Sequence, residues 1–226
     1  MDKSTGAFLA IWHGLINEEK AEWEKWHTYE HMQERVEIPG FLGGRRYMNN
    51  NYKEQSCFTI YEGKNLSIFQ SAPYLEKLNS PTPWTKKNAK SFINFTRGAC
   101  KCVSISGQKN GYGGSIITIR VLKDKDFKHD LKYFDQLTSK IYKLNGIISS
   151  ALGICHTETT STETKERKLR KSTKETSLEG VLLIEGYDEL ILRENKTKIE
   201  DIINSSSTNL KSQKTQFYRL SYIQKK

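Results

Sequence analysis

Hydrophobic residues are grouped in short runs with the period of a β-strand, and segments with helical spacing separate these runs. The first run, residues 7–15, is largely apolar on both alternate sets, which is typical of a strand covered on both faces. One set comprises Phe8, Ala10 and Trp12, and the other comprises Leu9, Ile11 and His13. The pattern therefore predicts a sheet that has packed side chains on each side.

The first half of the chain continues with alternating helices and strands. Asn17 is a candidate N-cap, because the acidic residues that follow it suit the positive end of a helix running to about Glu34. Pro39-Gly40 ends this region. Further strands are predicted at 41–48, 56–62 and 95–104, with a proline-broken helical region at 66–92. The order βαββαβ is the ferredoxin-like arrangement.

The same order recurs in the second half. Strands are predicted at 115–122, 148–156, 178–187 and 217–223, and helices at 127–144 and 194–203. Asn145-Gly146-Ile147 corresponds in position to Pro39-Gly40-Phe41. We therefore expect an α+β fold with repeats at 1–107 and 115–226, joined by a linker at 108–114. If the open apolar faces of the two sheets pack together, one chain forms a barrel-like unit with a small-molecule cleft between its halves.

The net charge of +10 is partly concentrated in a charged segment at 157–177, whose basic core spans 163–176. Few apolar residues occur there, so the sequence predicts a flexible, solvated insertion. A basic tether can touch phosphates without specificity, but no recognised nucleic-acid-binding motif accompanies it. We expect no nucleic-acid partner, and a homodimer remains open.

No run of about 18 apolar residues is present, and the start of the chain lacks the pattern of a secretory signal. Both observations favour a cytoplasmic protein without a membrane partner. The four cysteines lie in apolar segments, which favours reduced, buried thiols over a metal or redox site. Cys100 and Cys102 are expected to point to the same face of a strand.

Residues 26–47 hold the densest group of polar side chains. Neutral imidazole is the usual proton shuttle, and a guanidinium can hold a carboxylate or stabilise an enolate-like oxygen. The candidate catalytic residues are His31, Arg46 and Glu30. The candidate substrate-binding residues are Trp12, His13, Trp26, His27, Arg45 and Tyr47. We expect this cluster at the seam between the two sheets.

Structural roles are open for several of these side chains. Glu34 and Arg35 are expected to form surface pairs, and His13 is also compatible with a satisfied core histidine. The histidines lack the spacing of a common metal motif, so no metal ligand is predicted.

The segment EHMQERVEIPGFLGGRRY, preceded by WEKWHTY, resembles a motif of EthD-like proteins, which belong to the dimeric α+β barrel superfamily. The stretches SAPYLEKLNSPTPWT and FINFTRGAC are similar to a long, tandem-repeat branch of that group. The resemblance covers about the first 115 residues. Gln33 stands where the motif usually has proline, and KIYKLNG at 140–146 lacks the histidine and arginine pattern, so the resemblance implies a site in the first half alone.

The superfamily includes cofactor-independent isomerases, lyases, cyclases and monooxygenases, haem enzymes, and proteins without known activity. The resemblance therefore implies a cleft and leaves its chemistry open. Our leading hypothesis is a cofactor-independent enzyme acting on a small organic acid or aromatic metabolite. The alternatives are a non-catalytic binding or stress-related protein and a haem enzyme, for which His156 or His129 would be the proximal ligand.

Overall fold

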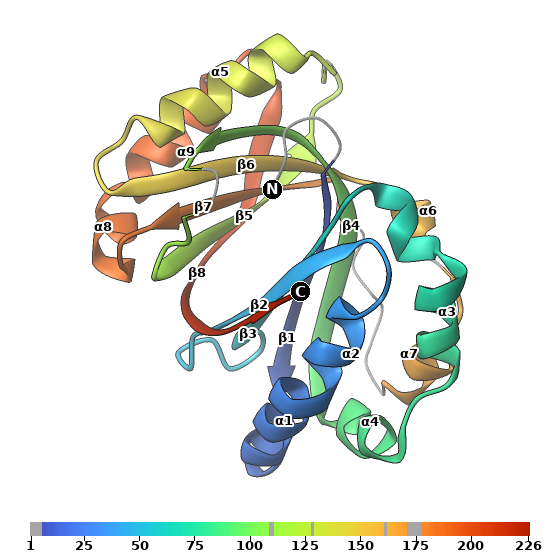
Figure 1. The fold of residues 1–226 in the computed structure, drawn as a ribbon. Coiled ribbons are helices and arrows are strands. Elements are labelled where there is room, and N and C mark those ends of the chain that lie inside the picture. The colour runs from blue at the N-terminus through green and yellow to red at the C-terminus, as the bar shows by residue number, and fades with distance from the viewer. Residues whose placement is uncertain (1–5, 109–110, 128, 161, 171–177) are drawn as a thin grey trace.

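Eight strands form one closed barrel in the computed structural model, which describes residues 6–108, 111–127, 129–160, 162–170 and 178–226 (Figure 1). The strands are β1 (Ala7–Leu15), β2 (Phe41–Met48), β3 (Cys57–Gly63), β4 (Phe92–Gly107), β5 (Ser115–Lys123), β6 (Ile147–Cys155), β7 (Gly180–Gly186) and β8 (Leu210–Lys225). Their order around the barrel is β1-β3-β2-β8-β5-β7-β6-β4. Each half contributes four neighbouring antiparallel strands, and the β2–β8 and β4–β6 pairs join the halves.

The helices cover the outside of the barrel (Figure 1). Those from the first half are η1 (Asn17–Glu19), α1 (Lys20–Trp26), η2 (His27–His31), α2 (Met32–Val36), η3 (Leu66–Gln70), α3 (Ala72–Asn79), α4 (Pro83–Asn88) and η4 (Ala89–Ser91). Those from the second half are α5 (Leu131–Tyr142), α6 (Thr157–Thr160), α7 (Lys165–Leu169), α8 (Glu189–Glu194) and α9 (Lys196–Asn204). The expected α+β class and barrel-like unit are confirmed, although the two sheets close edge to edge as well as facing each other.

The centre of the barrel interior is an apolar cluster shared by both halves. Phe8, Ala10 and Trp12 point inward, as their alternation predicts, and meet Tyr218 and Leu183 from the second half. The opposite set of β1 side chains faces the helices. Burial of this interior between the halves explains why one chain closes the barrel alone.

The corresponding turns of the halves have the same backbone geometry. Gly40 and Gly146 both adopt positive φ, at 95° and 78°, which favours glycine. The carbonyl of each accepts a hydrogen bond from the residue that follows the third strand of its half, Lys64 or Tyr187. A bulge begins the next strand in both cases. The predicted correspondence of these two turns is confirmed.

Several expected boundaries are wrong. Asn17 lies inside a short 3-10 turn, and Ile16 occupies the N-cap position. Pro73 and Pro83 lie in the first turns of α3 and α4 and so begin helices, because proline lacks only an N–H that is unpaired there. The last strand begins at Leu210 rather than Phe217, since neighbouring strands supply partners for a polar stretch that shows no alternation.

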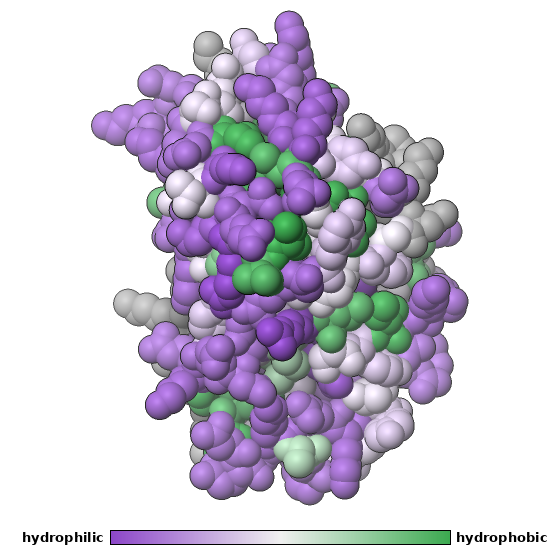
Figure 2. All heavy atoms as spheres, turned by 90° about the vertical axis from the view of Figure 1, so that its left-hand side faces the viewer, coloured by the Kyte–Doolittle hydropathy of each residue, from purple (hydrophilic) through white to green (hydrophobic). Residues whose placement is uncertain are grey.

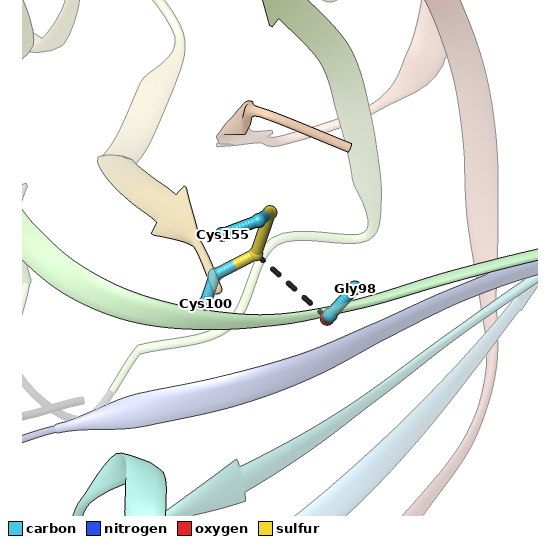
Figure 3. Close-up of a disulfide and its surroundings, with 3 residues drawn as sticks. All are labelled: Gly98, Cys100 and Cys155. Carbon is cyan, nitrogen blue, oxygen red and sulfur yellow. Dashed lines mark hydrogen bonds between the residues drawn. A yellow bond between two sulfur atoms is a disulfide. The ribbon is translucent and has the colours of Figure 1, made fainter. Parts of the chain in front are cut away.

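The expectation of four reduced thiols is wrong for two cysteines. Cys100 and Cys155 form a disulfide between β4 and β6, where they are register partners (Figure 3). The Cys100 sulfur also lies 3.7 Å from the Gly98 carbonyl oxygen. A cross-link that closes a loop of this length stabilises a fold by about 4 kcal/mol in the chain-entropy account. Cys57 and Cys102 are buried thiols. Cys102 faces the barrel interior together with Cys100, as expected.

No helix among the described residues is long and apolar enough to cross a membrane. The face shown in Figure 2 is mostly hydrophilic, with small separate groups of hydrophobic side chains. Scattered apolar residues of this kind are normal on a protein surface. That face therefore offers no broad apolar patch for a partner.

Candidate functional site

The helical segment of residues 20–36 contains a π-helical turn, η2, at His27–His31. The turn lies between α1 and α2, so the segment is one helix with a wider turn at its centre. Single π-turns inside α-helices are rare and occur frequently at functional sites. The sequence predicted regular i, i+4 spacing of the two histidines, and their ring centroids lie 5.4 Å apart in the wider turn.

Three imidazoles meet between this helix and the outer face of the sheet. His13 comes from β1, and its ring centroid lies 5.0 Å from that of Trp23. Trp23 stacks on His27 at 4.5 Å, and Trp26 packs on His31 at 4.4 Å. We call this group the first-repeat layer, comprising His13, Trp23, Trp26, His27, His31, Arg46 and Phe92.

Burial keeps these imidazoles neutral. It lowers the pKa of His13 to about 3, and nearby cations contribute to the shift. Burial also lowers the pKa of His27 and of His31, the latter with help from the charge of Arg35. Because desolvation disfavours the charged form, all three rings are uncharged at neutral pH. They are therefore proton acceptors or neutral donors in this state.

The hydrogen bonds assign different tautomers to two rings. Nδ1 of His13 lies 3.0 Å from the Gly14 carbonyl oxygen and must donate to it, so Nε2 carries the lone pair. Nδ1 of His27 accepts from Arg46 at 3.4 Å, so its Nε2 carries the proton. The layer thus holds one ring with an accepting Nε2 and one with a donating Nε2.

Arg46 supplies the positive charge of the layer. Its Nη1 also donates to Thr28 Oγ1 at 3.0 Å and to the Glu24 carbonyl at 3.4 Å. The partners of Arg46 among the described residues include no carboxylate, and its buried Nε has no acceptor there. A buried guanidinium without a counterion is suited to an anionic group of a ligand.

Other buried polar atoms around the layer also have no partner within the described part of the chain. They are Nδ1 of His31 and Nε1 of Trp23. Most buried polar atoms in proteins are hydrogen-bonded, so such a group needs an explanation. A polar ligand or ordered water between helix and sheet would satisfy them.

The insertion from the second half reaches across the first. Helix α7 lies beside α3, and α6 lies beside η3 (Figure 1). We call residues 157–160 and 165–170 the strap. Arg35 forms a buried ion pair with Glu166 of the strap. The guanidinium of Arg170 lies 4.0 Å from the ring centroid of Phe95, close to the histidines.

These contacts correct the prediction of a solvated insertion for the part that the structure describes. Residues 161 and 171–177 lie outside the described residues. Arg35 was expected to form a surface pair, but it is buried and binds the strap. The polar sequence of the strap gave no signal for this packing, because its anchor is a long-range ion pair.

Glu30 is held by the scaffold. Its carboxylate accepts from Trp26 Nε1 at 3.1 Å, Thr82 Oγ1 at 2.7 Å and Thr85 Oγ1 at 3.4 Å. These bonds connect the π-turn to the start of α4. These three donors hold the Glu30 carboxylate in place beside Trp26.

Three of the predicted site residues lie on the other face of the sheet. Trp12 and Tyr47 are in the barrel core, and Arg45 binds Glu62 at 2.7 Å and Glu185 at 2.6 Å. The seam between the halves therefore holds this ion cluster, and the expectation of the histidines at the seam is wrong. Because adjacent strand residues face opposite sides, Arg45 and Arg46 cannot serve one site.

The described residues of the second repeat form no place suited to a haem. Both suggested proximal ligands, His129 and His156, are exposed. The space between α5, α9 and the sheet is filled by an apolar cluster that includes Phe134, Leu137 and Leu152. The packed side chains there leave no space for a haem. Within the described residues, no three His, Cys, Asp or Glu side chains are grouped as metal ligands.

Comparison with known proteins supports the fold. No model of a protein family matches the chain, and no curated protein sequence matches it. Among solved structures, an anthrone oxidase-like protein has a TM-score of 0.65 at 6% identity, covering 99% of this chain and 94% of the other. A putative monooxygenase from Fusobacterium nucleatum has a TM-score of 0.57 at 11% identity, with coverages of 99% and 96%.

A third similar structure is a mutant chlorite dismutase from Candidatus Nitrospira defluvii. Its TM-score is 0.55 at 8% identity, covering 96% of this chain and 92% of the other. At identities this low, the similarity shows a shared fold and does not show a shared function. The chain has the fold of the ferredoxin-like dimeric α+β barrel proteins, formed here by one polypeptide.

Proposed function

We propose that this chain is a small-molecule enzyme that needs no resident cofactor and that its site is the first-repeat layer. The observation that carries the proposal is the buried, uncharged His31, whose Nδ1 has no partner among the described residues. A neutral imidazole enclosed by aromatic rings is suited to accept a proton from a bound substrate.

The proposed substrate is an aromatic or small organic acid with an acidic C–H or phenolic O–H group. His31 accepts that proton, and the charge of Arg46 stabilises the resulting anion. The rings of Trp26 and Phe92 hold the flat part of the substrate. The proton-bearing Nε2 of His27 is a further donor to a developing oxyanion.

Among the reactions open to such an anion, we favour oxidation by dioxygen. The names of two similar structures, an anthrone oxidase-like protein and a putative monooxygenase, support this choice. The motif around His31 and Arg46 supports placement in the EthD-like, tandem-repeat branch. The predicted cytoplasmic location and homodimer stay predictions.

The test is turnover of a panel of anthrones and related phenols, followed by oxygen uptake and product absorbance. We expect His31→Leu to lower kcat/KM by about 10²-fold or more while the protein stays folded, because general-base contributions have this size. His156→Leu removes an exposed imidazole and is the matched control.

Equal turnover by wild type and His31→Leu would contradict the proposal. Ligand-dependent stabilisation without turnover of any compound would identify a binding protein instead.

A further inference from the structure

A second group of cations lies inside the barrel, at the end away from the Arg45 ion cluster. Arg120 extends from β5 under the indole of Trp12, with its guanidinium carbon 4.5 Å from the ring centroid. Gln55, Gln216 and Lys214 complete what we call the Arg120 cluster. It lies on the opposite side of the sheet from the first-repeat layer.

The cations of this cluster share a neutral acceptor. Nη2 of Arg120 donates to Gln55 Oε1 at 2.8 Å, and Lys214 Nζ donates to the same oxygen at 3.1 Å. The amide of Gln55 is fixed in this orientation, since its Nε2 donates to Asn94 O and Thr96 Oγ1. A second amide oxygen, from Gln216, lies 3.4 Å from Nη2. Two positive charges thus meet at one neutral oxygen, and the negative charge of Glu54 acts on Lys214 alone.

The guanidinium is both buried and incompletely bonded. Arg120 is only 7% exposed, and its Nε has no acceptor in the described part of the chain. No carboxylate of the described residues pairs with it, and burial lowers its pKa to about 10. The pKa of Lys214 is also lowered, by burial and by the charge of Arg120, which together outweigh the opposite effect of Glu54. Uncompensated buried charge costs free energy, which a bound anion would offset.

The geometry points to an anion-binding site formed by Arg120 and Lys214, with the indole of Trp12 as one wall, for a small oxyanion such as a phosphate or carboxylate group. Guanidinium and ammonium groups together form short, charge-assisted hydrogen bonds with such oxygens. Lys214 is exposed, so the site opens to solvent at this end of the barrel.

Titration calorimetry and thermal unfolding with inorganic phosphate, sulfate and succinate test the site, at constant ionic strength set with chloride. We expect saturable binding by wild type and a rise in unfolding midpoint of about 3 °C at ten times Kd. Tighter binding of phosphate than succinate would assign a phosphorylated ligand, and the reverse order an organic acid.

Arg120→Met removes the central charge and is expected to abolish binding. Lys214→Met is expected to weaken it about tenfold, whereas Lys211→Met, an exposed change on the same strand, leaves Kd unchanged. Gln216→Glu supplies the missing negative charge from within the chain, and it should abolish binding while raising the midpoint in anion-free buffer.

Binding that survives in both Arg120→Met and Gln216→Glu would overturn the site, as would no saturable binding of any of the three anions. If Arg120→Met does not fold, Gln216→Glu alone decides. His31→Leu retains anion binding, so a failure here is distinct from failure of the proposed enzyme.

Discussion

In the second repeat, the space between helix and sheet is filled with apolar side chains, whereas the same space in the first repeat holds imidazoles and a guanidinium. Counting from the two equivalent glycines and along the paired strands gives direct counterparts. His13, His31, Arg35 and Arg46 correspond to Val121, Leu137, Ile141 and Leu152. Each of these four aliphatic residues is buried in the second-repeat cluster.

This difference separates what the fold requires from what a site requires. The second repeat shows that an apolar layer satisfies the architecture. Polar groups without partners in the first repeat cost stability, and proteins tolerate this mainly where the groups have a function. The first-repeat layer is therefore the part of the molecule whose composition folding alone does not explain.

The largest expected effect comes from placing a histidine in the second repeat at the position that corresponds to His31. Leu137→His removes an aliphatic side chain from a packed core and buries an imidazole without a partner. We expect a loss of about 3–5 kcal/mol in the free energy of unfolding, measured with urea. A loss below 1 kcal/mol would show that the two layers are equally tolerant and would remove the contrast.

A smaller loss is expected when the strap loses its anchor. Arg35→Met leaves Glu166 buried without its cation, which costs about 3 kcal/mol. Lys77→Met breaks a surface pair with Glu34 and is the control, with a change within about 0.5 kcal/mol. Equal effects of the two changes in urea unfolding would mean that the strap is not fixed by this pair.

Acid should destabilise the first-repeat layer selectively. The folded pKa of His13, about 3, lies below its unfolded value of 6.5, so the unfolded state binds the proton first. The contribution of the neutral His13 ring to the free energy of unfolding is fully present above pH 6.5, and it is lost as the pH falls towards 3. At pH 5 this residue alone costs about 2 kcal/mol, and His27 and His31 act in the same direction.

His13→Val introduces the residue type of its second-repeat counterpart, Val121. In this variant we expect the loss of unfolding free energy between pH 7 and pH 5 to be about 2 kcal/mol smaller than in wild type. His129→Gln changes an exposed histidine and serves as the control. Urea unfolding at the two pH values makes the comparison, and an unchanged slope in His13→Val would contradict a neutral, buried ring.

The strands with clear alternation could be predicted from the sequence. The bounds of β1 and β2 were predicted correctly. β1 is a nearly continuous apolar run, and β2 lies between the Pro39-Gly40 turn and the Asn49-Asn50-Asn51 turn. The first part of β8 was missed since its residues are polar and partly exposed. Its hydrogen bonds come from strands far away in the sequence, which no local pattern reports.

The candidate site was only partly predictable. The helix that carries His27 and His31 was expected, but the π-turn and the burial of the rings depend on packing against the sheet. Strand alternation already implied that Arg45 and Arg46 point to opposite faces of the sheet, so the prediction of both in one site was an error. A usable signal was missed in the matching Glu-Gly pairs Glu62-Gly63 and Glu185-Gly186, whose carboxylates meet at Arg45.

The most direct test of the central claim replaces two residues of the first-repeat layer by their second-repeat counterparts, in His31→Leu/Arg46→Leu. The free energy of unfolding at pH 7, from urea titration monitored by circular dichroism, is the quantity to measure. If the polar groups are kept for chemistry, the double variant is as stable as wild type or more stable by about 1 kcal/mol. A loss of more than about 2 kcal/mol would contradict the claim, because the polar layer would then be holding the fold together.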